Sequence, residues 1–130
     1  MSGEPCHVLV VEDHPTLRQA ILLVLRDAGM VVEEAANGDV ALVALRRERP
    51  DAILLDMNIP GASGPEVLTA IRADPATAGI PVIVMTATGD EGRSAAMALG
   101  AVDYLTKPFS SHALLRSVER ALGASGSPGA

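Results

Sequence analysis

The stretch "AILLDMNIPGASG", residues 52–64, sets an apolar run directly against a carboxylate. The four residues before Asp56 suit a buried strand, but the charge of Asp56 is costly to bury unless something compensates it. Pro60, Gly61 and Gly64 then follow, and these residue types shape tight loops. The stretch therefore predicts a core strand that holds Asp56 rigidly at the edge of a sheet, where a loop exposes it.

Strand and helix patterns alternate along the rest of the chain. Short aliphatic runs predict strands at 7–13, 30–35, 51–56, 80–86 and 101–106. Apolar residues at helical spacing predict helices at 14–29, 37–49, 63–74, 89–100 and 110–123. Near-continuous apolar strands are typical of a parallel sheet that is covered on both faces. The pattern therefore predicts an α/β fold, a doubly wound three-layer sandwich with short right-handed crossovers.

Length and composition indicate a single domain with an aliphatic core. The chain has 130 residues, 48% of them hydrophobic but only 2% aromatic. We expect the domain to span 1–123 and residues 124–130, "ASGSPGA", to form a flexible tail or linker. No run is long enough to span a membrane and no signal sequence is evident, so we expect a cytoplasmic protein without membrane contact.

Charge and cysteine content exclude several kinds of site. A net charge of −6 disfavours direct nucleic-acid binding, which needs a basic face, but leaves cation binding open. The single cysteine, Cys6, excludes an internal disulfide and cysteine-rich zinc sites, and we expect it to be a buried apolar residue at the start of a strand. His7, His14 and His112 lie on separate predicted elements without ligand spacing, which predicts no role for them in metal binding.

Polar residues follow four of the predicted strands. Glu12 and Asp13 follow the first strand, Asp56 the third, Thr86 the fourth and Lys107 the fifth. The carboxyl ends of parallel strands share one edge of the sheet, which is where α/β sheets bind ligands. We therefore expect these side chains to converge there.

Three carboxylates at one point require cations. Two unit charges 4 Å apart repel by about 4 kcal/mol at an effective dielectric constant of 20. Lys107 supplies one positive charge, and Mg²⁺, which prefers oxygen ligands, would supply two more. A carboxylate held beside Mg²⁺, a lysine and a hydroxyl is suited to accept a phosphoryl group, so Asp56 is the candidate nucleophile through an aspartyl phosphate.

The ordered set Glu12-Asp13, Asp56, Thr86 and Lys107-Pro108 resembles the receiver domain of bacterial two-component response regulators, over about residues 7–122. The resemblance implies a flavodoxin-like sheet with five strands in the order 2-1-3-4-5 and five helices. It implies a signalling switch that takes a phosphoryl group from a phosphohistidine of a sensor histidine kinase or of a histidine phosphotransfer protein. It also implies slow autodephosphorylation without turnover of external substrates, a downstream protein target, and a monomer or phosphorylation-dependent homodimer.

The resemblance further implies a role for each site residue. Asp13 and Asp56 would ligate Mg²⁺ directly, Glu12 mostly through water and Asn58 through its backbone carbonyl. Lys107, Thr86 and Ala87 would surround the phosphoryl group, and the small Ala87 would leave an opening for the donor or for water. Tyr104 would turn from exposed to buried when Thr86 moves, the peptide before Pro108 would be cis, and Asn58 and Thr88 would tune hydrolysis.

Each residue also has a structural interpretation. Asp13 could merely cap the first helix, Glu12 could be a solvated strand end, and Lys107 could be a surface lysine. Thr86 could be an ordinary strand-end hydroxyl and Tyr104 a half-buried core residue.

Three other functions are open on the residues alone. A phosphatase of the haloacid-dehalogenase type also uses aspartate and Mg²⁺, but its nucleophile follows the first strand, with a second Asp two positions on; position 58 here is Asn. A flavodoxin-like electron carrier needs aromatic residues around its flavin, and this chain has only Tyr104 and Phe109. A receiver that only docks proteins and is no longer phosphorylated is the third alternative.

Overall fold

The computed structural model describes residues 5–87 and 90–126 and contains one parallel sheet. The strand order is β2-β1-β3-β4-β5, which confirms the doubly wound α/β fold. The strands are β1 (His7–Val11), β2 (Val31–Ala35), β3 (Ala52–Asp56), β4 (Val82–Thr86) and β5 (Asp103–Thr106). All adjacent pairs are parallel, so the carboxyl ends of the strands lie at one edge.

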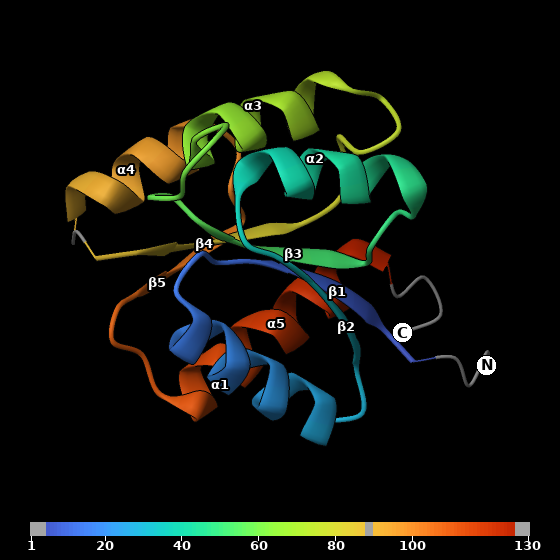
Figure 1. Cartoon of the computed structure of the whole chain (residues 1–130), viewed down its shortest axis with the longest axis vertical. Helices are drawn as coiled ribbons and strands as arrows, with labels where there is room; N and C mark the ends of the chain where they lie inside the picture. Colours follow the sequence, from blue (N-terminus) through green and yellow to red (C-terminus); the bar gives the residue numbers. More distant parts are fainter. Residues whose placement is uncertain (1–4, 88–89, 127–130) are drawn as a thin grey trace.

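Helices cover both faces of the sheet. They are α1 (Pro15–Asp27), α2 (Gly38–Arg47), α3 (Gly64–Ala73), α4 (Asp90–Ala98) and α5 (Ser111–Gly126). Figure 1 shows α2, α3 and α4 on one face and α1 with α5 on the other. The sandwich thus has the three layers that the apolar strands predict.

Side-chain alternation along the strands divides the core into two layers. In β1, Leu9 and Val11 belong to the cluster under α2, α3 and α4, whereas Val8 and Val10 belong to the cluster with α1 and α5. All four side chains are at most 1% exposed. Full burial of one such side chain stabilises the fold by about 1.5–3 kcal/mol, so the sheet is a rigid support for the residues at its edge.

Local sequence sets where two of the helices begin. The Asn37 side chain accepts a hydrogen bond of 2.8 Å from the backbone N–H of Val40 and caps α2. Ser63 and Glu66 form a capping box at the start of α3. The first helix is different, because its N-cap is His14, without a side-chain cap. Asp13 therefore does not cap α1, and the capping interpretation of that residue is wrong.

The loop after β3 depends on two glycines. A Cβ atom at Gly64 would lie 2.4 Å from the Cα atom of Met57, so only glycine lets α3 start this close to the loop. Gly61 has a φ of 77°, in the left-handed region that glycine adopts readily. Together they fold the chain back directly after Asp56.

The structure corrects two predictions at the ends of the chain. Cys6 is exposed and precedes β1, so it is not a buried strand residue. The strand begins one residue later, and its first contact with the core is Val8. Helix α5 continues to Gly126, three residues beyond the helix end predicted at Gly123. The rest of the predicted tail, 127–130, lies outside the described residues.

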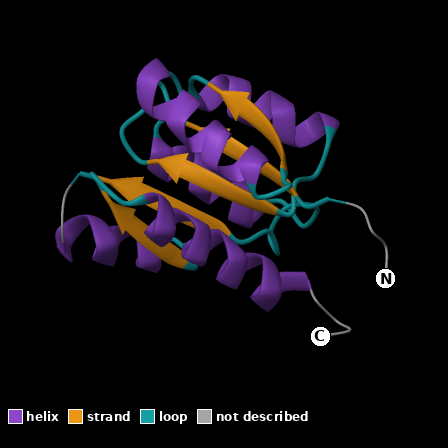
Figure 2. Ribbon diagram, turned by 90° about the horizontal axis from the view of Figure 1, so that it is seen from below, coloured by secondary structure: helices purple, strands orange, loops and turns teal. Residues whose placement is uncertain are grey.

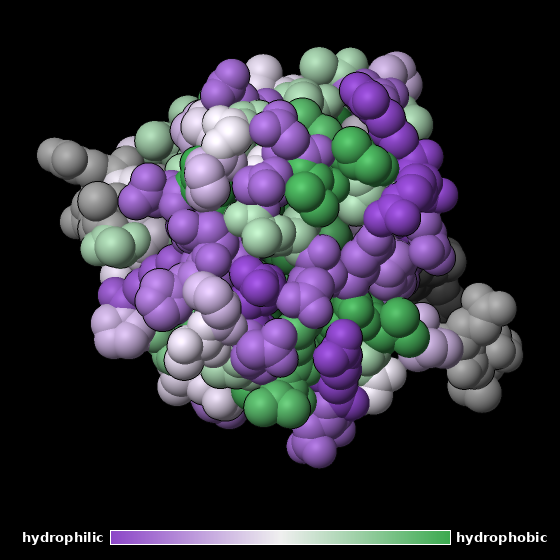
Figure 3. Space-filling model, viewed as in Figure 1, coloured by the Kyte–Doolittle hydropathy of each residue, from purple (hydrophilic) through white to green (hydrophobic). Residues whose placement is uncertain are grey.

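Few large hydrophobic residues are exposed among those that the structure describes. They are spread over several elements: Leu23 on α1, Val31 on β2, Val40 and Val43 on α2, Met97 on α4, and Val102 just before β5. Figure 3 shows mostly hydrophilic residues on one face, with hydrophobic residues in small separate groups. Across 5–87 and 90–126, none of the helices has both the length and the apolar character needed to cross a membrane.

Candidate active site at the carboxyl edge of the sheet

A cavity opens at the edge where the strands end, and Figure 2 shows the strands running toward that common edge. Its volume is about 680 Å³. It brings together most of the residues that the sequence predicts for the site. The lining consists of Glu12, Asp13, His14, Leu17, Asp56, Met57, Asn58, Thr86, Ala87 and Lys107. Residues from the ends of β1, β3, β4 and β5 therefore converge, although they are far apart in the sequence.

An ion-pair bridge is the centre of this site. The Lys107 Nζ atom donates to Oε1 of Glu12 and to Oδ2 of Asp56, each at 2.9 Å. Glu12 is 0% exposed and Asp56 is 4% exposed. The structure therefore contradicts the interpretations of Glu12 as a solvated strand end and of Lys107 as a surface lysine. Because Glu12 and Asp56 are buried, their negative charges need a paired cation, and Lys107 provides it.

Burial and pairing shift the protonation of two of these groups. Burial raises the pKa of the Glu12 carboxyl, and the nearby charge of Asp56 adds to the rise, while Lys107 opposes it. For Lys107, burial alone would lower the pKa, but the hydrogen bonds to Glu12 and Asp56 outweigh it and the pKa is raised. Lys107 thus remains a cation.

The carboxylates are arranged as a cation site. One oxygen each of Glu12, Asp13 and Asp56 lies within 4.8 Å of the others, and Asp13 is exposed. The other oxygen of Asp56, Oδ1, accepts a hydrogen bond of 3.0 Å from the backbone N–H of Asn58. Carboxylate oxygens are the ligand type that Mg²⁺ prefers, and the ion usually keeps several waters when it binds a protein. The cavity beside these carboxylates provides room for such waters.

The remaining site residues lie at the end of β4 and on the loops that follow β4 and β5. Thr86 is the last residue of β4 and is buried, and its carbonyl accepts a hydrogen bond of 2.8 Å from the backbone N–H of Lys107. The peptide between Lys107 and Pro108 is cis, as predicted. Thr88 lies outside the described residues.

Tyr104 does not line the cavity. It lies on β5 and is half-buried, with the Arg93 guanidinium 5.0 Å from the centre of its ring. At this distance the guanidinium makes a cation–π contact. Arg93 on α4 is therefore placed to respond to any movement of Tyr104.

One residue that orders the site was not found from the sequence. The Arg18 side chain on α1 donates to the carbonyl of Glu12 at 2.8 Å and pairs with Oε1 of Glu34 at 2.7 Å. It ties the loop after β1 to β2. An arginine one turn into a helix is an ordinary surface residue in sequence, so only the fold shows its role.

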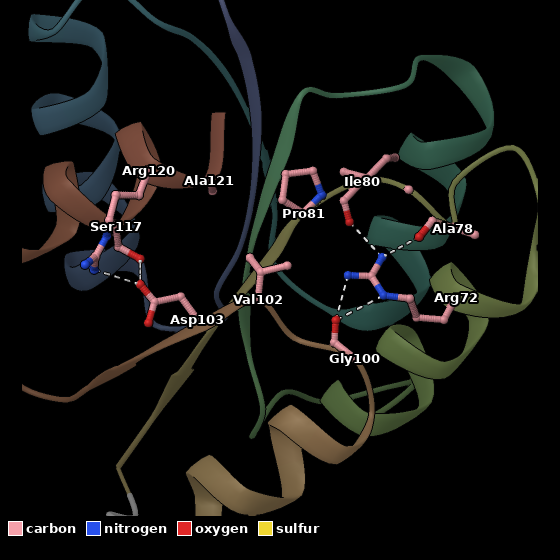
Figure 4. Close-up of a pocket in the computed structure, with 11 residues that line it drawn as sticks. Arg72, Ala78, Ile80, Pro81, Gly100, Val102, Asp103, Ser117, Arg120 and Ala121 are labelled. Atoms are coloured by element: carbon pink, nitrogen blue, oxygen red, sulfur yellow. Dashed lines mark hydrogen bonds and ion pairs between the residues drawn. The ribbon is translucent and has the colours of Figure 1, made fainter. Parts of the chain in front are cut away.

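A second cavity, of about 660 Å³, lies near the start of β4 and β5 (Figure 4). Arg72 on one side donates to the carbonyls of Gly100, Ala78 and Ile80. On the other side, Asp103 accepts from Ser117 and Arg120. These hydrogen bonds connect α3 to the segments before β4 and β5, and α5 to β5.

The chain is similar in sequence to known response regulators. The family model described as the response regulator receiver domain matches residues 8–119. The chain is 41% identical over 109 residues to the probable transcriptional regulatory protein TcrX of Mycobacterium tuberculosis, covering 83% of this chain and 46% of TcrX. It is 37% identical over 120 residues to the phosphate regulon transcriptional regulatory protein PhoB of Pseudomonas aeruginosa, covering 92% and 52%. The chain thus spans about half the length of the curated relatives it matches.

Solved structures give the same result. The chemotaxis response regulator CheY4 of Vibrio cholerae superposes with a TM-score of 0.87 at 34% identity, over 92% of this chain and 100% of that one. The receiver domain of sensor histidine kinase PA1611 from Pseudomonas aeruginosa gives a TM-score of 0.86 at 35% identity, covering 92% and 99%, and contains a magnesium ion in its active-site cleft.

Proposed function

Because this chain belongs to the response regulator receiver family, we propose that it is a signalling switch phosphorylated on Asp56 with the help of Mg²⁺. Members of this family act in two-component signalling and are switches, not turnover enzymes. The observation that carries the proposal is the bridge from Lys107 to both Glu12 and Asp56 inside the cavity at the sheet edge. That bridge holds the acceptor carboxylate beside a cation that neutralises incoming phosphoryl charge.

The transfer requires one bond to form and one to break. An Asp56 carboxylate oxygen attacks the phosphorus of a phosphohistidine, the P–O bond forms and the P–N bond breaks. The electron pair of the broken bond stays on the imidazole nitrogen of the donor, which leaves as histidine. Lys107, 2.9 Å from Asp56, stabilises the charge on the phosphoryl oxygens, and the backbone N–H of Asn58 orients the acceptor.

The acidic residues fit Mg²⁺. Asp13, Asp56 and the carbonyl of Asn58 would hold the ion, with Glu12 acting through water. When bound, Mg²⁺ neutralises charge on the transferring phosphoryl group. Ala87 is exposed at the mouth of the cavity, and its small side chain leaves a path for the donor and, later, for a hydrolytic water. Hydrolysis of the aspartyl phosphate would be slow and would reset the switch.

The change of surface would begin at Thr86, the last residue of β4. The Thr86 hydroxyl would bind the phosphoryl group and draw the loop after β4 inward. Tyr104 would then become more buried and change its contact with Arg93, which alters the surface formed by α4, β5 and α5.

We propose protein partners for this surface. The donor would be a sensor histidine kinase or a histidine phosphotransfer protein, and the acceptor of the signal a downstream protein or a second copy of the chain. The curated relatives TcrX and PhoB are transcriptional regulators about twice as long as this match. With a net charge of −6, these 130 residues themselves would contact proteins rather than DNA.

Intact-protein mass after incubation with acetyl phosphate tests the proposal. Wild-type protein is expected to gain one phosphoryl group with Mg²⁺ and none without it. Asp56→Asn is expected to gain none, whereas Asp27→Asn, an exposed carboxylate at the end of α1, keeps the reaction. Mg²⁺ binding without any phosphoryl gain, even from a phosphohistidine donor, would instead identify a docking module.

A further inference from the structure

A second group of ionisable side chains lies away from the phosphorylation site. His7 opens β1, whereas the cavity residues follow the other end of the strands. One atom each of His7, Glu33 and Glu48 lies within 4.8 Å of the others. Glu33 comes from β2, and Glu48 is the residue that ends α2. Three elements therefore converge here without any part in the phosphoryl chemistry.

The imidazole of His7 is held between the two carboxylates without a direct hydrogen bond. Its Nε2 atom is 3.7 Å from Oε1 of Glu33, and its Nδ1 atom is 3.8 Å from Oε2 of Glu48. Both distances exceed hydrogen-bond length. Nδ1 is buried, and it has no hydrogen-bond partner within 5–87 and 90–126. Leaving a buried polar atom without a partner destabilises a fold by about 1–3 kcal/mol. A ligand that binds Nδ1 of His7 would remove this cost.

We infer that His7, Glu33 and Glu48 form a binding site for a divalent transition metal such as Zn²⁺. Imidazole nitrogen and carboxylate oxygen are both zinc ligands, and three protein ligands leave the fourth position of a zinc site to water. Metal–ligand bonds of about 2.0–2.2 Å would draw the three ligand atoms together by roughly 1 Å. Glu48 provides this movement, because its side chain is 70% exposed.

The surroundings hold the other two ligands in place. The backbone N–H of His7 donates to Oδ2 of Asp51 at 2.8 Å, which fixes the start of β1. The Arg47 guanidinium forms an ion pair of 3.0 Å with Oε2 of Glu33. The other oxygen of Glu33, Oε1, lies toward His7. The metal would thus link β1, β2 and the end of α2, and it would stabilise the fold by mass action.

Zinc titration of the full, tag-free chain by calorimetry tests this site. The background carries Cys6→Ser, Asp13→Asn and Asp56→Asn, which removes the exposed thiol and the other acidic cluster. We expect one zinc ion per chain and a rise in melting temperature. His7→Gln and Glu48→Gln should each weaken binding by about tenfold or more. His112→Gln and Glu119→Gln, exposed positions on α5, serve as matched controls without effect.

Cobalt gives a readout that does not depend on stability. Co²⁺ in the same background is expected to show visible absorption bands of a four- or five-coordinate site, and His7→Gln should abolish them. Circular dichroism checks that each variant folds, and Glu48→Gln, a change on an exposed side chain, guards against a folding defect at His7. Absence of zinc binding, or binding that survives both ligand substitutions, would overturn the site.

Discussion

The Nζ atom of Lys107 lies 2.9 Å from Oδ2 of Asp56, although 51 residues separate them in the chain. Lys107 is the single lysine of the sequence. The same ammonium group donates to Glu12, so one cation holds two buried carboxylates. The acceptor that we propose, its counter-charge and the carboxylates that we propose as Mg²⁺ ligands therefore lie together in the unphosphorylated protein.

Replacing Lys107 by methionine tests the value of that cation. The substitution leaves the buried carboxylates of Glu12 and Asp56 without their cation. It also removes the positive charge that would lie beside the transferring phosphoryl group. We expect the rate of phosphorylation by acetyl phosphate to fall about 100-fold, the scale of losing one transition-state donor. Arg116→Met, which removes an exposed cation from α5, should leave the rate unchanged. An undiminished rate in Lys107→Met would show that Mg²⁺ alone neutralises the phosphoryl group.

Tyrosine fluorescence tests the switch. Tyr104 is the one tyrosine and the chain has no tryptophan, so its emission reports a single site. In the switch that we propose, phosphorylation would bury Tyr104 further and change its contact with Arg93, so the emission should change. In Thr86→Ala, we expect phosphorylation to persist while the fluorescence change is lost. Identical emission changes in Thr86→Ala and wild type would separate Tyr104 from the Thr86 loop.

Gly64→Ala tests the close approach of α3 to the loop after Asp56. The added Cβ atom would meet the Met57 backbone at 2.4 Å and displace the loop that carries Asn58. We expect weaker Mg²⁺ binding and slower phosphorylation. Gly123→Ala is the control, since nothing lies within 4 Å of a Cβ atom there. That control should stabilise α5 by up to about 1 kcal/mol, as measured by urea unfolding, and leave Mg²⁺ affinity as in wild type.

The capping box of α3 predicts a pH dependence of stability. Hydrogen bonds from the backbone and side chain of Ser63 lower the pKa of Glu66 below its ordinary value of 4.5. A lowered pKa in the folded state contributes stability above pH 4.5, and this contribution is lost as the pH falls through the folded value. Glu66→Gln should therefore destabilise the protein at neutral pH, with a difference from wild type that shrinks in acid.

Urea unfolding across a pH series measures this difference. Ser63→Ala should cost about 1 kcal/mol at neutral pH, the usual scale for loss of an N-cap. Glu119→Gln, on the exposed side of α5, is the matched control. A Glu66→Gln difference that stays constant from neutral to acid pH would show that the carboxylate charge plays no part in the cap.

Much of this architecture could be predicted from local patterns. Apolar runs such as 52–55 and 82–85 belong to β3 and β4, and the cap at Ser63 begins α3. Glu12, Asp13, Asp56, Thr86 and Lys107 could be selected because polar residues that follow parallel strands share one edge. These inferences rest on periodicity and chain order, which the sequence contains directly.

The sequence by itself determined the alternation of strands and helices and the residue types that meet at the carboxyl edge. Only the tertiary structure decided the geometry that makes them interact. Lys107 pairs with both Glu12 and Asp56, Glu12 is completely buried, and Arg18 anchors the loop after β1 through the carbonyl of Glu12. It also decided that Cys6 is exposed and that His7 lies between two glutamates. The physical reason is that burial and side-chain distance depend on contacts between distant segments, and no local pattern records them.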